Sequence, residues 1–111
     1  MTEAGGRTPQ EEFWAGGFGD DYSDRNVGAN WIAANTALFA RILERTGAIG
    51  SAIEFGANSG LNLRALDILK PGIELDAVEI NATAAERLGA WGRARVHQSS
   101  VFDFHPDRHW D

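Results

Sequence analysis

The sequence predicts an α/β fold in which a parallel sheet carries helices on both faces. Three observations support this expectation. Short apolar runs alternate with longer stretches of helical periodicity, and turn residues separate the two kinds of segment. Their order is helix, strand, helix, strand, helix, strand, which requires right-handed crossovers. Apolar residues make up 43% of the 111 residues, a proportion typical of one ordinary globular domain.

The N-terminal part divides into two segments. Residues 1–10 are small and polar, with two glycines and a proline, and we expect a flexible terminus there. Residues 11–111 are expected to form the folded part. Residues 11–22 suit a short helix and a loop whose aromatic rings pack on the rest of the domain, namely Phe13, Trp14, Phe18 and Tyr22.

Residues 27–45 have the periodicity of a long amphipathic helix. Trp31, Leu38 and Ile42 fall on one stripe at a period of 3.6 residues. Gly47 stands where a left-handed residue commonly ends a helix. Further apolar or small residues lie beside the stripe, namely Ala34, Asn35, Phe39 and Leu43.

The next segments form a strand, a glycine-rich turn and a helix. Residues 51–55 are a short apolar run, typical of a buried strand, that ends in Glu54 and Phe55. Residues 60–69 return to helical spacing, and Pro71 with Gly72 stops the helix. This arrangement is a β-strand that leads through a tight turn into a helix.

A second and a third strand follow in the same manner. Residues 73–79 alternate and then become apolar, so they are expected to form the second strand. Asn81 can cap a helix that runs from residue 82 to 88 or 91. Residues 94–98 are the third expected strand, and a loop follows from Ser99. We therefore expect a sheet that is truncated after its third strand.

Charge and composition exclude several classes of function. The net charge is −6, with 10 basic and 16 acidic side chains and no basic cluster, so nucleic-acid binding is not expected. Cysteine is absent, and the histidines lack ligand spacing, so neither a disulfide nor a metal site is expected. The apolar runs are too short to span a membrane, and the N-terminus lacks the pattern of a signal peptide. A cytoplasmic protein is the expectation.

The turn E-F-G-A-N-S-G, residues 54–60, is the candidate ligand site. In open α/β sheets, ligands bind outside the carboxyl ends of the strands. Gly56 can adopt a backbone angle closed to other residues, and Gly60 opens the helix where a side chain would collide with the strand. The turn lacks the G-x-G-x-x-G spacing of a dinucleotide site. Because Glu54 would repel a diphosphate, a cationic ligand fits this turn better.

Glu79 ends the second strand and supports a nucleoside pocket. An acidic side chain at this position can accept hydrogen bonds from both ribose hydroxyls. Any adenosine cofactor would use it in the same way. Glu79 therefore predicts a nucleoside without choosing among cofactors.

These motifs resemble those of class I S-adenosylmethionine-dependent methyltransferases. E-F-G-A-N-S-G followed by V-E-I-N is similar to motif I and the acidic strand-two motif, so a Rossmann-like methyltransferase fold is implied. F-W-A-G-G-F-G-D (13–20), with Tyr22 and Arg25, and the segments around residues 103 and 110 further resemble the pseudaminic acid biosynthesis-associated methylases. The sequence departs from the broader pattern at Asn58, which replaces a glycine, and at Ser100, which replaces an acidic residue.

The resemblance implies S-adenosyl-L-methionine as cofactor and assigns its contacts. Glu54, Gly56, Ala57, Asn58 and Gly60 would surround the methionine end. The other contacts would hold the ribose, the two sides of the adenine and the donor carboxylate, and they are Glu79, Ile80, Ser100, Val101, Tyr22 and Arg25. The implied acceptor is a small molecule such as a nonulosonic sugar or a surface polysaccharide precursor.

The catalytic base stays unassigned, because in this fold it usually follows a fourth strand. The chain is expected to be the N-terminal, cofactor-binding part of a methyltransferase domain. Two alternatives remain open at this point. One is a non-catalytic nucleoside-binding domain, and the other is a fragment of an NAD-dependent oxidoreductase. The sequence does not settle the oligomeric state.

Overall fold

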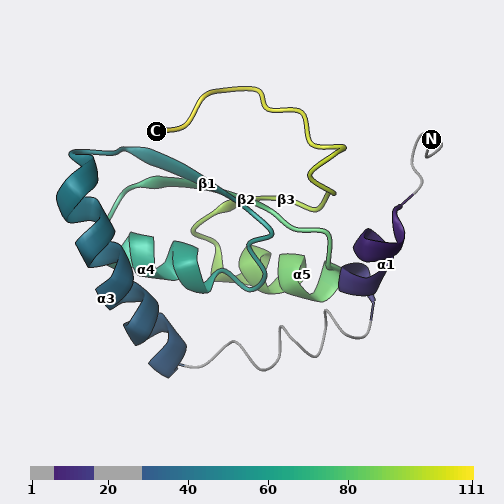
Figure 1. The fold of residues 1–111 in the computed structure, drawn as a ribbon, viewed down its shortest axis with the longest axis horizontal. Coiled ribbons are helices and arrows are strands. Elements are labelled where there is room, and N and C mark those ends of the chain that lie inside the picture. The colour runs from purple at the N-terminus through teal and green to yellow at the C-terminus, as the bar shows by residue number, and fades with distance from the viewer. Residues whose placement is uncertain (1–6, 17–28) are drawn as a thin grey trace.

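The computed structural model describes residues 7–16 and 29–111 (Figure 1). From residue 29 onward, helices and strands alternate along the chain. Their bounds are α1 (Pro9–Ala15), α3 (Ala29–Thr46), β1 (Ser51–Phe55), α4 (Leu61–Leu69), β2 (Glu74–Val78), α5 (Ala82–Trp91) and β3 (Arg95–His97). The α/β class and the succession of elements expected from the sequence are confirmed.

The three described strands form one parallel sheet in the order β1-β2-β3. Ser51 is paired with Glu74 and Phe55 with Val78, while Asp76 is paired with Arg95. The parallel pairing confirms the expected crossovers through α4 and α5. It also brings the carboxyl ends of the strands to one edge of the domain.

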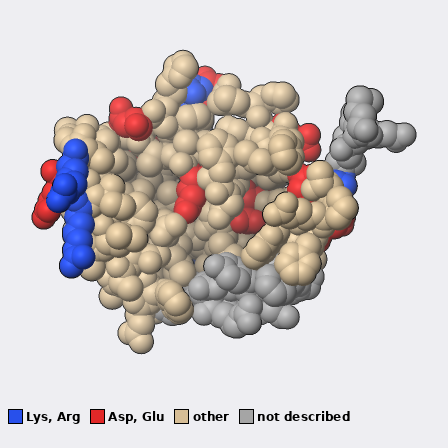
Figure 2. Space-filling view, in the orientation of Figure 1, with Lys and Arg blue, Asp and Glu red and all other residues tan. Residues whose placement is uncertain are grey.

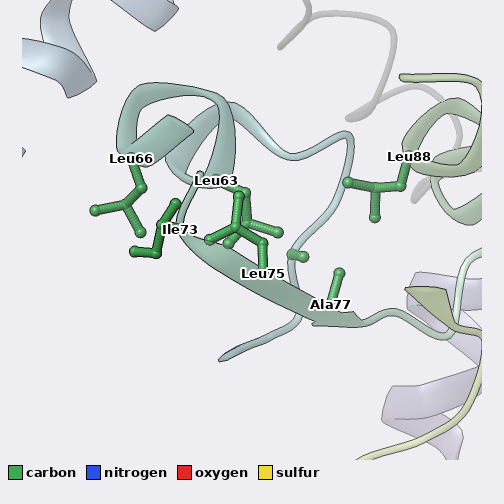
Figure 3. Close-up of a cluster of buried hydrophobic side chains, with 7 residues drawn as sticks. Leu63, Leu66, Ile73, Leu75, Ala77 and Leu88 are labelled. Atoms are coloured by element: carbon green, nitrogen blue, oxygen red, sulfur yellow. The ribbon is translucent and has the colours of Figure 1, made fainter. Parts of the chain in front are cut away.

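The hydrophobic core lies between the sheet and helices α4 and α5. Leu75 and Ala77 of β2 point toward the helices and are nearly inaccessible to solvent. They meet leucines from α4 and α5, and Figure 3 shows these side chains gathered against the strand. The whole buried cluster consists of Ala57, Leu63, Leu66, Ile73, Leu75, Ala77 and Leu88. Burial of such side chains is the main force that holds the helices to the sheet.

The C-terminal segment, residues 98–111, covers the other face of the sheet (Figure 1). Helices α4 and α5 lie on the opposite face from this segment. This segment makes hydrogen bonds to residues in β2 and at the start of β1. Trp110 Nε1 donates to Asp76 Oδ1 at 3.1 Å, and Gly50 N donates to Asp111 Oδ2 at 2.7 Å.

Asp76 is the centre of this polar face. Only 2% of the residue is exposed, yet it accepts hydrogen bonds from Arg95 Nε at 2.7 Å and His97 Nε2 at 2.8 Å. Burial acts to raise the pKa of Asp76, but the hydrogen bonds from Arg95, His97 and Trp110 outweigh it and lower the pKa below its usual value. The buried carboxylate is therefore charged and satisfied.

The residues of α3 that pack inward lie beside the stripe of Trp31, Leu38 and Ile42. Trp31 and Leu38 are more than half exposed, and Ile42 is 41% exposed. Phe39 and Leu43 instead pack against the core cluster. Both stripes are apolar, so periodicity alone could not choose between them. Gly47, with φ +75°, follows the helix in the expected left-handed conformation.

Helix α1 begins within the segment that was expected to be flexible. Its first residue is Pro9, and Thr8 and Glu11 form a capping box in which each side chain accepts from the backbone N–H of the other residue. The helix therefore starts two residues before residue 11, where the folded part is expected to begin. The sequence T-P-Q-E carried the signal, since a capping Thr, a Pro and a Glu at these positions favour the start of a helix.

Candidate functional site

The carboxyl ends of the strands open into a cavity of about 760 Å³. Figure 2 shows a recess in the middle of one face, with acidic atoms inside it. Its volume falls within the range of small-molecule sites, roughly 300–1,000 Å³. Eight of the residues assigned from the sequence line it, namely Glu54, Gly56, Ala57, Asn58, Glu79, Ile80, Ser100 and Val101.

The glycine-rich turn folds back on the end of β2. Gly56 N and Ala57 N both donate to the carbonyl oxygen of Val78. Gly56 has φ +75°, and Asn58 is the one described non-glycine residue with positive φ, at 55°. Asparagine tolerates this region better than most residues. Asn58 therefore adopts the left-handed conformation at the position where the broader pattern has a glycine.

Gly60 does not line the cavity but lies where the turn contacts α5. A Cβ atom at this position would lie 2.5 Å from Leu88 Cδ2, and φ is +85°. The expectation that the collision would involve the strand is wrong, because the neighbour belongs to α5. The absence of a side chain lets α5 approach the turn that carries the site.

Among the described residues, one carboxylate oxygen of Glu54 has no partner. Its Oε2 accepts from Asn62 Nδ2 at 2.6 Å, whereas Oε1 is buried and receives no hydrogen bond from residues 7–16 or 29–111. Burial raises the pKa of Glu54 above its usual value, and the hydrogen bond from Asn62 opposes that rise. The nearby carboxylate of Glu79 raises the pKa further. A donor with positive charge would satisfy the free oxygen and stabilise the charged form.

Glu79 ties the turn to the start of α5. Its Oε1 accepts from Asn58 N at 2.6 Å, and its Oε2 accepts from Asn81 N at 2.8 Å. Each carboxylate oxygen has a second lone pair, so both can still accept from a ligand hydroxyl. The buried position of Glu79 at the cavity wall fits the ribose contact expected from the sequence.

The described lining of the cavity is acidic. Three carboxylates face it, from Glu11, Glu54 and Glu79, and no Lys, Arg or His of residues 7–16 and 29–111 lines it. The Lys and Arg atoms that are visible on this face lie near its margins (Figure 2). Such a cavity attracts a cation and repels phosphate groups, because the field of clustered like charges is focused in a recess.

The far side of the cavity is a short loop after β3. Ser99 N donates to the carbonyl oxygen of Glu79, which fixes the loop beside Ile80. The hydroxyl of Ser100 accepts from Phe102 N and Asp103 N, so it stabilises its own turn. Ser100 therefore shapes this edge of the cavity.

Helix α1 forms a further wall that the sequence did not assign to the site. Thr8, Gln10, Glu11 and Trp14 line the cavity. Asn81 Nδ2 donates to the carbonyl oxygens of Trp14 at 3.0 Å and Ala15 at 3.3 Å, which fastens the end of α1 to the start of α5. This contact joins residues far apart in the sequence, so no local pattern could reveal it.

Tyr22 and Arg25 lie outside the described residues. Trp31, Asn35 and Asn62 line the cavity from α3 and α4, and none of them was assigned from the sequence.

No group of three or more acidic or histidine side chains in the described part could hold a metal ion. None of the described helices is long and apolar enough to cross a membrane.

Solved structures with the same arrangement identify the fold. The plantazolicin methyltransferase BpumL, in complex with a monoazolic desmethylPZN analog and SAH, is similar with a TM-score of 0.62 and 16% identity, over 88% of this chain and 41% of that chain. DesVI of Streptomyces venezuelae is similar with a TM-score of 0.60 and 16% identity, over 81% of this chain and 38% of that chain. The chain has the Rossmann-like methyltransferase fold.

A third structure with this methyltransferase fold is the O-MT of StiE. Its TM-score is 0.57 at 22% identity, over 80% of this chain and 35% of that chain. The chain thus spans about two fifths of the length of the structures that it matches. The sequence itself matches no protein-family model and no curated protein.

Proposed function

We propose that the chain is the cofactor-binding part of an S-adenosyl-L-methionine-dependent methyltransferase. One observation carries the proposal: a carboxylate with a free, buried oxygen stands at the mouth of the glycine turn, in a cavity whose described lining holds no cation. The fold is the same as that of BpumL, which was solved with SAH. SAH, S-adenosylhomocysteine, is the product that remains after the methyl group of this cofactor has been transferred.

The described residues fit the chemistry of this cofactor at both ends. Its sulfonium and ammonium are cations, and Glu54 Oε1 lacks a donor. Its ribose carries two hydroxyls, and Glu79 retains acceptor capacity at the buried end of β2. A dinucleotide would instead place a diphosphate beside Glu54, where two further carboxylates face the same cavity. This contrast disfavours the NAD-dependent alternative.

Within this proposal the chain binds and orients the cofactor. Bound S-adenosylmethionine supplies an electrophilic methyl group, which an acceptor heteroatom takes up in an in-line displacement while the sulfur keeps the bonding electron pair. Catalysis of such a step rests mainly on holding the two reactants in near-attack geometry. Glu54 and the turn would hold the methionine end, and Glu79 the ribose, with Ile80 and Val101 beside the adenine. Tyr22 and Arg25 remain candidates to meet the donor carboxylate.

The acceptor is proposed from the sequence resemblance to be a nonulosonic sugar or a surface polysaccharide precursor, in a cytoplasmic enzyme. A transfer assay with sugar nucleotides as acceptors tests this part. Methylation of none of them, by a chain that binds the cofactor, would favour the non-catalytic nucleoside-binding alternative.

Calorimetric titration tests the cofactor directly. We expect the chain to bind S-adenosylmethionine and S-adenosylhomocysteine but not NAD. The variant Glu54→Gln removes the charge and keeps the shape, so it should weaken binding of S-adenosylmethionine by about tenfold or more, as for a charge-assisted hydrogen bond of roughly 1.5–3 kcal/mol. Tight binding of NAD, or equal affinities of wild type and variant, would refute the proposal.

A further inference from the structure

Three elements meet at Glu54 through a chain of side-chain hydrogen bonds. Asn35 Nδ2, on α3, donates to Asn62 Oδ1, on α4, at 2.9 Å. Asn62 Nδ2 then donates to Glu54 Oε2, on β1, at 2.6 Å. All three residues line the cavity. We propose that Asn35 and Asn62 are positioning residues, which hold Glu54 so that its other oxygen faces the cationic end of the bound cofactor.

The direction of every hydrogen bond in this chain follows from the charge on Glu54. An ionised carboxylate only accepts, so Asn62 must turn its amide nitrogen toward it. The amide oxygen of Asn62 then faces Asn35, which must donate. If either amide were reversed, two acceptors would face each other at one of the two contacts. The network thus has one self-consistent arrangement, and it uses Oε2 rather than Oε1.

The free oxygen has no donor from any described element around it. Glu79, from the end of β2, and Glu11, from α1, can only accept when they are charged. Asn62 is already engaged with Oε2. Arg64, on the same helix, donates to the carbonyl oxygen of Ser59 and stacks over the ring of Trp91, away from the cavity. Among the described residues, Oε1 is therefore the oxygen left open to a ligand donor.

This inference rests on the proposed function, and it predicts how cofactor binding depends on pH. Without the bond from Asn62, burial and the charge of Glu79 would act unopposed and raise the pKa of Glu54 further. The affinity for a cation falls as pH falls through that pKa, because protonation removes the charge. A variant that lacks the amide should therefore lose affinity at a higher pH than the wild type.

The test compares two ligands and three variants of the full chain. S-adenosylhomocysteine carries an ammonium group, whereas 5′-methylthioadenosine shares the nucleoside but lacks that group. The binding affinities are measured by calorimetry at several pH values. At neutral pH, Asn62→Leu should weaken binding of S-adenosylhomocysteine about tenfold, which is the effect of one charge-assisted hydrogen bond. The affinity for 5′-methylthioadenosine should stay unchanged. Asn35→Leu should weaken binding of S-adenosylhomocysteine about threefold. Thr36→Val, which removes only a bond within α3, is the control and should change neither affinity.

A second measurement separates this inference from the proposed function. Carboxyl carbon resonances followed by NMR report the titration of Glu54 without any ligand, and the midpoint should move to higher pH in Asn62→Leu. Equal losses for both ligands would show a merely structural role, and an unmoved midpoint would also overturn the inference. If the wild type binds neither ligand, the proposed function fails, while the titration still judges the hydrogen-bond chain. Should Asn62→Leu fail to fold, Asn35→Leu carries both measurements.

Discussion

Replacement of Gly60 by alanine tests how the turn and α5 are packed. A Cβ atom there would lie 2.5 Å from Leu88 Cδ2, well inside van der Waals contact. Leu88 is completely buried in the core cluster, so it has no free space into which it can turn. The backbone adds a second penalty, because φ is +85° and alanine is strained in that region.

The two effects give the expected loss of stability. The left-handed backbone costs about 1–2 kcal/mol for a residue with a Cβ, and over-packing of a core costs about 1–3 kcal/mol. We expect Gly60→Ala to lower the free energy of unfolding by about 2–5 kcal/mol in total. Gly72→Ala is the matched control, since φ is +88° and nothing lies within 4 Å of its Cβ position. It should lose only the backbone part, about 1–2 kcal/mol.

Urea unfolding of a double-mutant cycle measures the packing part by itself. Leu88→Ala removes the atoms that collide, so its loss and that of Gly60→Ala should combine to less than their sum, by about 1–3 kcal/mol. Leu88→Ala and Gly72→Ala should be additive. The reasoning is refuted if Gly60→Ala and Gly72→Ala cost the same, or if the Gly60–Leu88 cycle is additive.

Three further variants test the polar contacts. Glu54→Gln should raise the free energy of unfolding at pH 8 but not at pH 4. The reason is that a carboxyl group whose pKa is raised by folding costs stability only once pH exceeds the pKa of the unfolded chain. An equal gain at both pH values in urea unfolding would contradict this. Asp76→Asn should make the stability of the protein less sensitive to acid. The lowered pKa of Asp76 gives stability that is present above the pKa of the unfolded chain and is lost as pH falls through the pKa of the folded protein. Acid unfolding curves that coincide with those of the wild type would argue against this. Asn81→Ser keeps an oxygen to cap α5 but loses the donors to α1, so hydrogen exchange should speed up in residues 9–15 and stay slow in α5.

The local elements could be predicted from the sequence because their signals are local. The strand at residues 51–55 was found with its final bounds, since a buried apolar run between glycines has little alternative. Asn81 was recognised as a cap because its position before a helical stretch is itself the signal. The positive φ of Gly56 followed from the tightness of the turn. These features need no knowledge of distant contacts.

The rest depended on contacts between distant parts of the chain. Which apolar stripe of α3 packs inward is decided by the shape of α4 and β1, and Phe39 was preferred over Leu38 only in three dimensions. The C-terminal segment covers the second face because Asp76 offers acceptors to it, a partner invisible to periodicity. Asn35 and Asn62 joined the site through hydrogen bonds across three elements, which no spacing encodes.

A crystal structure of the chain with S-adenosylhomocysteine tests the central claim most directly. The account predicts that the amino nitrogen of the ligand lies roughly 2.7–3.1 Å from Glu54 Oε1, a hydrogen-bond distance, and that the ribose hydroxyls donate to Glu79. A ligand bound with its amino group turned away from Glu54, while Oε1 keeps no partner, would contradict the account.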